Sequence, residues 1–332
     1  MDIRFYNFNF ELLHIEPDII SSNWTVFNNN VGGFEIHFPI KTEIASLIAE
    51  NCDICRDRML VVIQGDLQGI VTSFIFGEDI AIFGKTCNWL LEKRVVTPFK
   101  STDVSGDALS CADIARVCAQ KAFYDVEEFE VAPTGDFTPV YSAERQFWRN
   151  VCHPLENVIS DIMKENGGGH FLYFDRTAKK WVLNFTKNRQ TDFVLSICLG
   201  TAVSQEYFRN ADTYAADGWF EEEVFDSEGL LTGFKWNKIS KNEKSGIYRF
   251  ETILENESLI EAETALGKKI PEDGAYMEGA GYNFGKDFFL GDIVCVQYEF
   301  GDFRADFRRV INGVSLGFEE GRKTVHVDFK EV

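Results

Sequence analysis

The sequence predicts an α+β fold that is mainly β, and three observations support this class. Of the 332 residues, 14% are aromatic and 31 are Phe, a residue type enriched in strands. From Asp287 to Phe329, apolar and polar residues alternate in three successive runs, with the period of two of a pleated strand. Turn residues at 301–302 and 320–321 separate these runs. An antiparallel meander that wraps part of a barrel is therefore predicted.

The periodicity of the remaining sequence divides the chain into three segments. Apolar residues at helical spacing predict helices at residues 43–50, 107–123, 154–165 and 258–268. Asp107 is expected to cap the second of these helices, and a long loop is expected at 125–139. The segments are a strand-rich part, a small α/β part and a second strand-rich part, at residues 1–97, 98–192 and 193–332.

The chain is strongly acidic. Its 53 acidic residues outnumber 33 basic residues and give a formal net charge of −20 at pH 7. This charge repels nucleic acid at long range, so binding of DNA in a groove is not expected. An acidic surface suits a conduit through which DNA slides without sticking, and it equally serves to keep a protein soluble.

Neither a membrane span nor a secretion signal is expected. No apolar run is long enough for a transmembrane helix, and the first residues lack the regions of a signal peptide, so synthesis in the cytoplasm is expected. The eight cysteines are scattered, several of them inside apolar runs. Most are expected to be buried, reduced thiols.

The closing segment carries the first of two matches to a known family. Leu290-Gly291-Asp292 leads into an apolar strand, and a basic strand follows that ends in Arg309-Val310-Ile311. A small turn at Asn312-Gly313 then precedes the final strand at 323–329. This order of elements resembles the end of the central hub proteins of phage tail tips and baseplates.

The second match lies near the other end of the chain. Strands expected at 59–64, 67–76 and 80–83 lead through Gly84 into a short helix and then into Arg94-Val95-Val96. The passage is similar to one in siphophage hub proteins, in which an amphipathic helix plugs an open barrel end. With both matches in order and at the family's spacing, the chain resembles the siphophage tail-tip and baseplate hub family, which is related to the contractile-phage baseplate hub.

The resemblance implies a fold and a function. The implied fold has two tube-type β-barrels, the first at 1–97 with its plugging helix and the second at 193–332 with a helical insertion, and a small α/β insertion at 98–192. The implied function is a structural hub, a homotrimeric ring that continues the tail tube of a phage or phage-like particle. The implied location is the virion, at the tail tip or baseplate, after synthesis in the host cytoplasm.

The resemblance also implies the partners. They are other copies of this chain, the distal tail protein ring, the tape measure protein, and receptor-binding or spike proteins. DNA passes through the channel without being bound specifically, and this chain inserts into no membrane. No enzymatic activity, cofactor or metal is expected, and no catalytic, cofactor-binding or metal-binding residue is assigned.

A second function class is a tail-associated protein that hydrolyses peptidoglycan or binds cell-wall polysaccharide. Hub proteins with a hydrolase carry it beyond the last hub strand. Since this sequence stops at Val332, shortly after Phe329, a hydrolase is not expected. The six Trp residues permit carbohydrate binding without requiring it.

A phosphate-binding loop is matched only in part. Gly84-Lys85-Thr86 lies between an expected strand and an expected helix, but the motif needs a Gly at the position of Asp79. The bulky strand residues before Gly84 cannot present a cradle of backbone amides to a phosphate. The tripeptide is therefore interpreted as the start of a helix.

Cys52 and Cys55 have the spacing of half a zinc site. A closed structural site needs a full set of ligands, and no second Cys-x-x-Cys or His pair follows at ligand spacing. Cys152 and His153 are adjacent, and adjacent residues usually point apart. Metal binding is therefore not expected.

Clustered acids and histidines form no catalytic pattern. The carboxylates at 221–223 and 127–128 are adjacent and face opposite ways on an extended segment, whereas a glycosidase pair converges across a cleft. The glycine-containing stretch 281–285 is expected to be a flexible loop. The five histidines are isolated and lack a nucleophilic Ser or Cys partner, at positions 14, 37, 153, 170 and 326.

Overall fold

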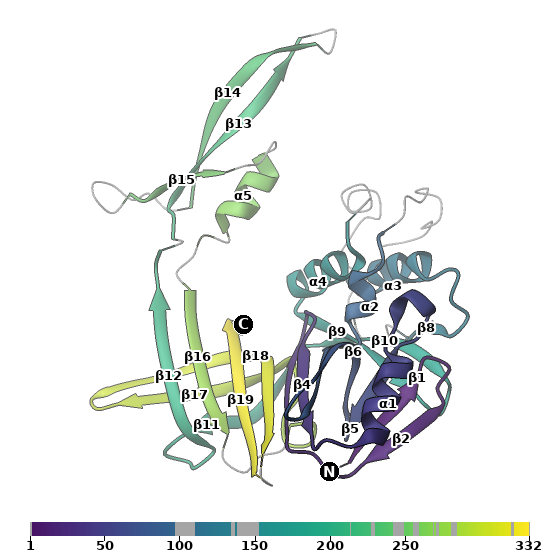
Figure 1. Ribbon diagram of the computed structural model, residues 1–332. Helices are drawn as coiled ribbons and strands as arrows, with labels where there is room; N and C mark the ends of the chain where they lie inside the picture. Colours follow the sequence, from purple (N-terminus) through teal and green to yellow (C-terminus); the bar gives the residue numbers. More distant parts are fainter. Residues whose placement is uncertain are drawn as a thin grey trace. The chain divides into compact units, whose positions relative to one another are not determined.

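The computed structural model divides the chain into two compact units (Figure 1). Unit 1 comprises Met1–Gln205 and Tyr276–Val332, and unit 2 comprises Glu206–Ala275. The division at residues 97 and 192 stays a prediction. The structure describes residues 2–96, 110–133, 137, 153–212, 214–226, 230–241, 249–254, 259–267, 269, 272–279, 284–319 and 322–331.

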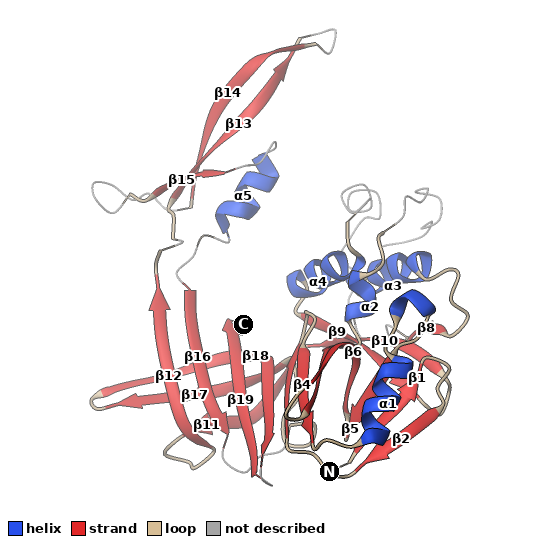
Figure 2. Ribbon diagram, viewed as in Figure 1, coloured by secondary structure: helices blue, strands red, loops and turns tan. Residues whose placement is uncertain are grey.

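One large sheet dominates unit 1 (Figure 2). Its strands run in the order β12-β16-β19-β18-β3-β4-β7-β6-β5-β1-β2. In addition, β17 pairs with β18, and β11 pairs with β17. The N-terminal strands are β1 (Ile3–Asn7), β2 (Leu12–Glu16), β3 (Ser21–Phe27), β4 (Gly33–Phe38), β5 (Leu60–Gln64), β6 (Leu67–Phe76) and β7 (Ile80–Thr86). The C-terminal strands are β11 (Arg189–Ser196), β12 (Ala202–Asn210), β16 (Glu272–Gly279), β17 (Asp292–Phe300), β18 (Phe303–Glu319) and β19 (Arg322–Glu331). The protein is therefore mainly β, as predicted.

The large sheet is open. Strands β12 and β2 lie at the two ends of the strand order, and they do not pair with each other within the described residues. None of the sheets in the described part of the chain closes into a barrel. The expectation of two barrels is therefore not confirmed.

The three closing strands form the predicted antiparallel meander. β17 pairs with β18, and β18 pairs with β19. On the apolar face of β17, Val294, Val296 and Tyr298 are buried, whereas Phe300, which lies next to the turn, is 45% exposed. The alternation in the sequence thus identified the buried face correctly except at the end of the hairpin.

Strand β18 is longer than expected because Asn312-Gly313 is not a turn. The register with β19 shifts between Ile311 and Gly313, which marks a β-bulge. Up to Val310, β18 pairs with β17, and from Gly313 to Glu319 it pairs with β3. The expected turn is wrong because the strand continues through it and changes its neighbour there.

Within the described residues, a small sheet and four helices complete unit 1. The sheet has the order β8-β10-β9 and consists of β8 (Phe129–Val131), β9 (Gly168–Asp175) and β10 (Lys180–Lys187). The helices are α1 (Thr42–Asn51), α2 (Trp89–Glu92), α3 (Cys111–Ala122) and α4 (Leu155–Glu165), with a 3₁₀ turn at Ile54–Arg56. None of the helices in the described part of the chain is long and apolar enough to cross a membrane.

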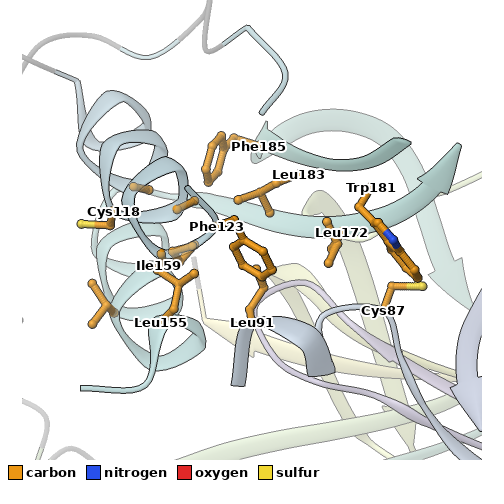
Figure 3. Packing of buried hydrophobic residues seen from close by; sticks show 14 of the residues in the cluster. Cys87, Leu91, Cys118, Phe123, Leu155, Ile159, Leu172, Trp181, Leu183 and Phe185 are labelled. Carbon is orange, nitrogen blue, oxygen red and sulfur yellow. The ribbon is translucent and has the colours of Figure 1, made fainter. Parts of the chain in front are cut away.

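The helices pack with the small sheet into one hydrophobic core (Figure 3). Ile159 of α4, Cys118 of α3 and Leu183 of β10 are fully buried there, beside Leu91 of α2. The same cluster includes apolar residues of β1, β5 and β6. The middle of the chain is therefore joined to the N-terminal strands by a shared core.

A side-chain signal explains where α3 begins, and one expected loop contains a strand. α3 begins in a capping box. The Ser110 hydroxyl accepts a hydrogen bond from the Asp113 backbone N–H, and the Asp113 carboxylate accepts one from the Ser110 backbone N–H. The expected cap, Asp107, lies outside the described residues. The loop expected at 125–139 contains the short strand β8, because its backbone pairs in parallel with β10.

Unit 2 is small and has its own core. Strand β13 (Asp217–Phe225) pairs with β14 (Leu231–Ser240) on one side and with β15 (Glu251–Leu254) on the other. Helix α5 (Leu259–Gly267), which was predicted, packs against β13 and β15. The core residues are Ala215, Phe220, Leu254, Ala262 and Leu266.

One aromatic ring in unit 1 requires two glycines. Phe34 of β4 stacks on Trp24 of β3 with ring centroids 4.4 Å apart, and its ring covers Gly69 of β6 and Gly84 of β7. A Cβ atom at Gly84 would lie 2.2 Å from the Phe34 ring and 2.3 Å from the Ile70 carbonyl oxygen. Glycine is thus needed at Gly84 for close packing across the sheet.

We expect Gly84→Ala to lower the free energy of unfolding by about 1–3 kcal/mol, because the added methyl group overpacks the contact with Phe34. Gly77→Ala is the matched control, since nothing lies within 4 Å of a Cβ at Gly77. Urea denaturation of the two variants and the wild type measures the effect. Equal midpoints for both variants would show that Phe34 does not need Gly84.

Candidate functional site

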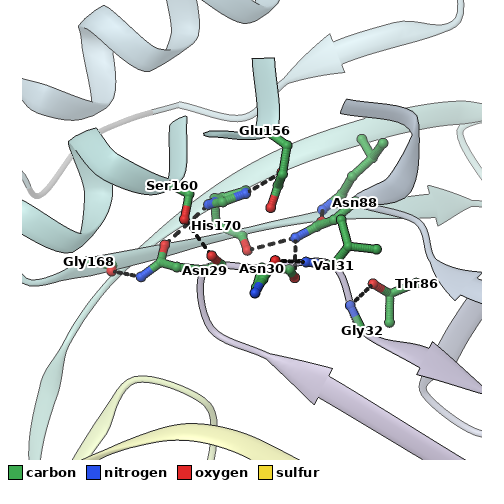
Figure 4. Close-up of polar contacts among 11 residues, drawn as sticks. Asn29, Asn30, Val31, Gly32, Thr86, Asn88, Glu156, Ser160, Gly168 and His170 are labelled. Atoms are coloured by element: carbon green, nitrogen blue, oxygen red, sulfur yellow. Dashed lines mark hydrogen bonds and ion pairs between the residues drawn. The ribbon is translucent and has the colours of Figure 1, made fainter. Parts of the chain in front are cut away.

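A buried polar cluster holds the loop between β3 and β4 (Figure 4). This loop contains Asn28, Asn29 and Asn30, and the first two side chains are buried. Asparagine side chains carry both a donor and an acceptor, so they can satisfy the backbone groups of an irregular segment that is shielded from water. We call Asn28, Asn29, Asn88, Glu156, Ser160 and His170 the asparagine-loop cluster.

Asn29 lies at the centre of this cluster. Its Nδ2 donates to the Gly168 carbonyl oxygen at 2.7 Å, and its Oδ1 lies 3.2 Å from His170 Nδ1. Its own carbonyl oxygen accepts a hydrogen bond from Ser160 Oγ at 2.5 Å. The loop is thereby attached to both α4 and β9.

His170 has a buried carboxylate partner. Its Nε2 lies 2.9 Å from Glu156 Oε2, and the exposed fractions of the two side chains are 0% and 2%. The expectation that the histidines are isolated is wrong at this position. It is also wrong for His14, which lies 3.5 Å from Glu16, and for His37, which contacts two carboxylates.

Ser160, His170 and Glu156 resemble a hydrolytic triad in composition only. In a triad the serine hydroxyl bonds to the histidine, whereas Ser160 bonds to a backbone carbonyl oxygen. All three side chains are buried, so a substrate has no access to them. The arrangement satisfies most of the buried polar atoms, with Glu156 Oε1 left without a hydrogen-bond partner among the described residues, and it is not arranged for nucleophilic attack.

Asn88 extends the cluster to the segment before α2. Its Oδ1 accepts the Leu172 backbone N–H at 2.7 Å, and its Nδ2 donates to the Asn30 carbonyl oxygen at 3.3 Å. Nearby, Thr86 Oγ1 accepts the Gly32 backbone N–H at 2.9 Å. The middle and the last residue of the loop between β3 and β4 are thus held by side chains around the end of β7.

Gly84-Lys85-Thr86 belongs to β7 and not to a helix start. Gly84 pairs with Phe34 of β4, and Lys85 pairs with Gly33. Backbone groups that form a sheet ladder do not form a phosphate cradle. The interpretation as a helix start is wrong because β7 continues to Thr86 and α2 begins only at Trp89.

The cluster also touches the bulge of β18. The Asn28 backbone N–H donates to the Asn312 carbonyl oxygen at 2.8 Å, and the Gly291 N–H donates to the Ile311 carbonyl oxygen at 2.9 Å. Gly291 has φ +83° and approaches the Asn28 side chain closely. The loop after β3 and the turn before β17 therefore meet where β18 changes its neighbour.

A bidentate ion pair fixes the start of β17. Arg189 Nε and Nη2 donate to the two oxygens of Asp292, each at 3.1 Å, and the Phe289 backbone N–H donates to Asp292 Oδ2 at 3.0 Å. Asp292 is buried. Its carboxylate therefore aligns β11 with β17, whose first paired residues are Arg189 and Asp292.

The described cysteines are free thiols. Burial raises the pKa of Cys52, Cys87 and Cys118 to about 12 in each case. Cys55 is exposed, and Cys152 lies outside the described residues. Among the residues that the structure describes, no group of three or more His, Cys, Asp or Glu side chains is placed to hold a metal ion.

The clustered acids lie as the strand period requires. Glu221 and Glu223 are in register with Trp236 and Phe234 of β14, whereas Glu222 is in register with Lys235 on the other face. Glu127 and Glu128 are exposed. Residues 281–283 of the expected glycine-containing loop lie outside the described residues.

Comparison with known proteins gives matches in structure only. No protein-family model and no curated protein sequence matches the chain. The 43 kDa tail protein of prophage MuSo2 from Shewanella oneidensis is 14% identical, with a TM-score of 0.57 over 100% of this chain and 98% of that chain. The tail protein from Neisseria meningitidis is 10% identical, with a TM-score of 0.58 over 100% and 97%. Prophage tail protein gp18 from Listeria monocytogenes is 11% identical, with a TM-score of 0.53 over 99% and 94%.

The three similar structures are all tail proteins, and each match covers nearly the whole of both chains. At this low identity, the similarity shows a shared fold. The chain therefore has the fold of phage tail proteins. The resemblance to this class that the two sequence matches indicated is confirmed at the level of fold.

We expect Asn29→Ala to lower the free energy of unfolding by about 2 kcal/mol, because it leaves the buried Gly168 carbonyl oxygen and His170 Nδ1 without this partner. Asn30→Ala is the matched control, since Asn30 is exposed and, among the described residues, its side chain accepts only the neighbouring Val31 N–H. Urea denaturation compares the two. A similar, small loss for both variants would contradict a structural role for the cluster.

The surface histidine His37 provides a test of pH dependence. Its Nε2 lies 2.7 Å from Glu35 Oε1 and its Nδ1 lies 2.6 Å from Asp79 Oδ2. Burial lowers the pKa of His37, but the hydrogen bonds to Glu35 and Asp79 outweigh burial, so the pKa lies above its ordinary value. The folded protein therefore holds this proton more tightly than the unfolded chain does.

We expect His37 to stabilise the protein fully below the unfolded pKa of about 6.5, and to lose this contribution as the pH rises through the raised folded pKa. The difference in urea midpoint between wild type and His37→Gln should therefore be larger at about pH 6 than at about pH 9. In a background with Glu35→Gln and Asp79→Asn, burial alone acts on the imidazole and lowers its pKa, so the difference should no longer be larger at about pH 6 than at about pH 9. A difference that is constant with pH in the wild-type background would contradict the assignment.

Proposed function

We propose that this chain is a structural subunit of a phage or phage-like tail tip or baseplate. In this role it forms a hub ring that continues the tail tube and connects the distal tail ring to host-recognition or puncturing parts. The observation that supports it most strongly is the fold shared with phage tail proteins over nearly the full length of both chains. The two sequence passages that resemble hub proteins, at 59–96 and 290–329, support the more specific role.

The ring is proposed to be a homotrimer in which each copy contributes two barrel-like halves. The candidate halves are the two groups of strands that meet at β18 and β3. In such an arrangement, a threefold ring of paired halves imitates the sixfold symmetry of a tail tube. Symmetric closure of this kind also leaves no sheet edge exposed.

The ends of the large sheet support assembly by strand pairing. Strand β2 is an edge strand, and its Leu12 and Ile15 are 48% and 45% exposed. At the other end, Val203 of β12 is 56% exposed. Free edges with exposed apolar side chains are a liability in a monomer and a means of association in an assembly.

The proposed partners are the distal tail protein ring, the tape measure protein and the receptor-binding or spike proteins of a virion. DNA is proposed to pass through the ring without specific binding, because a net charge of −20 repels its phosphates. The role is proposed to be structural and not enzymatic. The buried position of Ser160, Glu156 and His170 supports this, since a polymer chain cannot reach them.

We expect the purified protein to form a trimer, and we expect Ile15→Lys to shift it towards monomer because a lysine blocks pairing at the free edge of β2. Ile40→Lys is the control, since Ile40 is 66% exposed and lies outside the strands. Light scattering coupled to size exclusion measures the mass. Association should strengthen from low to moderate salt, because salt screens the repulsion between acidic subunits.

The hub proposal would be contradicted if the wild-type protein is strictly monomeric at both salt concentrations, even with the distal tail protein added. That result would favour a stand-alone domain that binds cell-wall polysaccharide. A trimer that Ile15→Lys and Ile40→Lys leave equally intact would retain the hub and place its interface elsewhere.

A further inference from the structure

The β13–β14 ribbon of unit 2 continues beyond the rest of its sheet (Figures 1 and 2). β15 pairs with β13 only from Asp217 to Phe220. From Glu221 to Phe225, β13 pairs with β14 alone in the described residues. No third strand covers or extends this outer half within the described residues of unit 2, and an isolated two-stranded ribbon is only marginally stable in water.

The outer half nevertheless carries large apolar side chains. Phe234 is 59% exposed and Trp236 is 51% exposed. Because they lie two residues apart on β14, their side chains share one face of the ribbon. Helix α5 packs on the opposite face, where Phe220 is buried, and so it does not cover them.

The same face is acidic. Glu223 stands opposite Phe234 in the register, and Glu221 stands opposite Trp236. Both glutamates are exposed, and neither has an ion-pair partner among the described residues. The cations at the base of the ribbon, Lys238 and Arg249, are bound to Asp217 and Glu251.

Each of these cross-strand pairs combines an aromatic ring with a carboxylate. An arginine or lysine side chain is attracted by both groups, since its cation interacts with the ring face and with the carboxylate charge. The two pairs lie roughly 7 Å apart along the ribbon, which is the distance between alternate residues of an extended chain. Two such pairs in a row therefore match a strand with basic residues at every second position.

We propose that this face, formed by Glu221, Glu223, Phe234 and Trp236, binds an extended segment of another protein that carries arginine or lysine at alternating positions. Charge decides between occupants. A second copy of this chain brings a net charge of −20, and nucleic acid and anionic lipid bring negative charge as well. A basic protein segment is the occupant whose charge complements the face.

The test is a titration of the full chain into a labelled short peptide of alternating arginine and serine, followed by fluorescence anisotropy at low salt. A peptide of the same composition with its arginines grouped tests the spacing, and an alternating glutamate–serine peptide tests the charge. We expect the alternating arginine peptide to bind more tightly than the grouped arginine peptide and the glutamate–serine peptide. Equal affinity for the grouped and alternating arginine peptides would overturn it.

The variants separate this face from diffuse attraction. Phe234→Ser with Trp236→Ser, and separately Glu221→Gln with Glu223→Gln, should each weaken binding by about tenfold. Glu222→Gln, on the other face, and Glu127→Gln with Glu128→Gln, in unit 1, should leave the affinity nearly unchanged. If these controls weaken binding as much as the other variants, the attraction is general and the proposal fails.

The oligomeric state of the same variants tests the remaining alternative, in which this face binds another copy of the chain. Light scattering should give the same mass for the wild type and for Glu221→Gln with Glu223→Gln, whose exposed positions tolerate the change. A loss of association in this variant would assign the face to contacts between copies and overturn the proposal. A failed trimer in the wild type contradicts only the hub ring, because peptide binding to this face does not require it.

Discussion

The pairing of β18 with β3 is the interaction on which the rest of unit 1 depends. It joins strands whose residues lie 290 positions apart, as the 3.1 Å contact between Thr25 Oγ1 and Ser315 Oγ shows. Without it, the N-terminal strands and the closing meander are separate groups with no shared ladder. The bulge at Asn312 makes the pairing possible, because it lets one strand leave β17 and continue along β3.

Local periodicity identified several elements, but it did not identify which strands pair with each other. The alternation of β17 and the helical spacing of α4 are local properties, and both elements were predicted from them. Asn312-Gly313 has turn-forming residues, yet it forms a bulge because β3 supplies partners for the residues that follow. Gly84 is likewise a residue type common in turns, but the pairing of β7 with β4 keeps it in a strand. Pairing between distant segments overrode local preference in both cases.

The asparagine-loop cluster was beyond the reach of sequence patterns for a related reason. His170 and Asn29 are 141 positions apart, and Ser160 reaches the same loop across 131 positions. No motif spacing relates such residues. A signal was present all the same, since three consecutive asparagines before Val31-Gly32-Gly33 indicate a segment that satisfies backbone groups with side chains. The carboxylate partner of His170 could not be identified in this way, because Glu156 lies on a helix whose orientation depends on the shared core.

Burial of the thiols has a consequence for the chemical durability of the protein. Burial raises the pKa of Cys87 and Cys118 to about 12, so the thiolate form of these side chains is scarce at neutral pH. Oxidants and alkylating reagents attack the thiolate and need access to it. These core cysteines should therefore stay unmodified when the folded protein meets oxidants. Exposed thiols such as Cys55 are the ones that oxidants and alkylating reagents would modify.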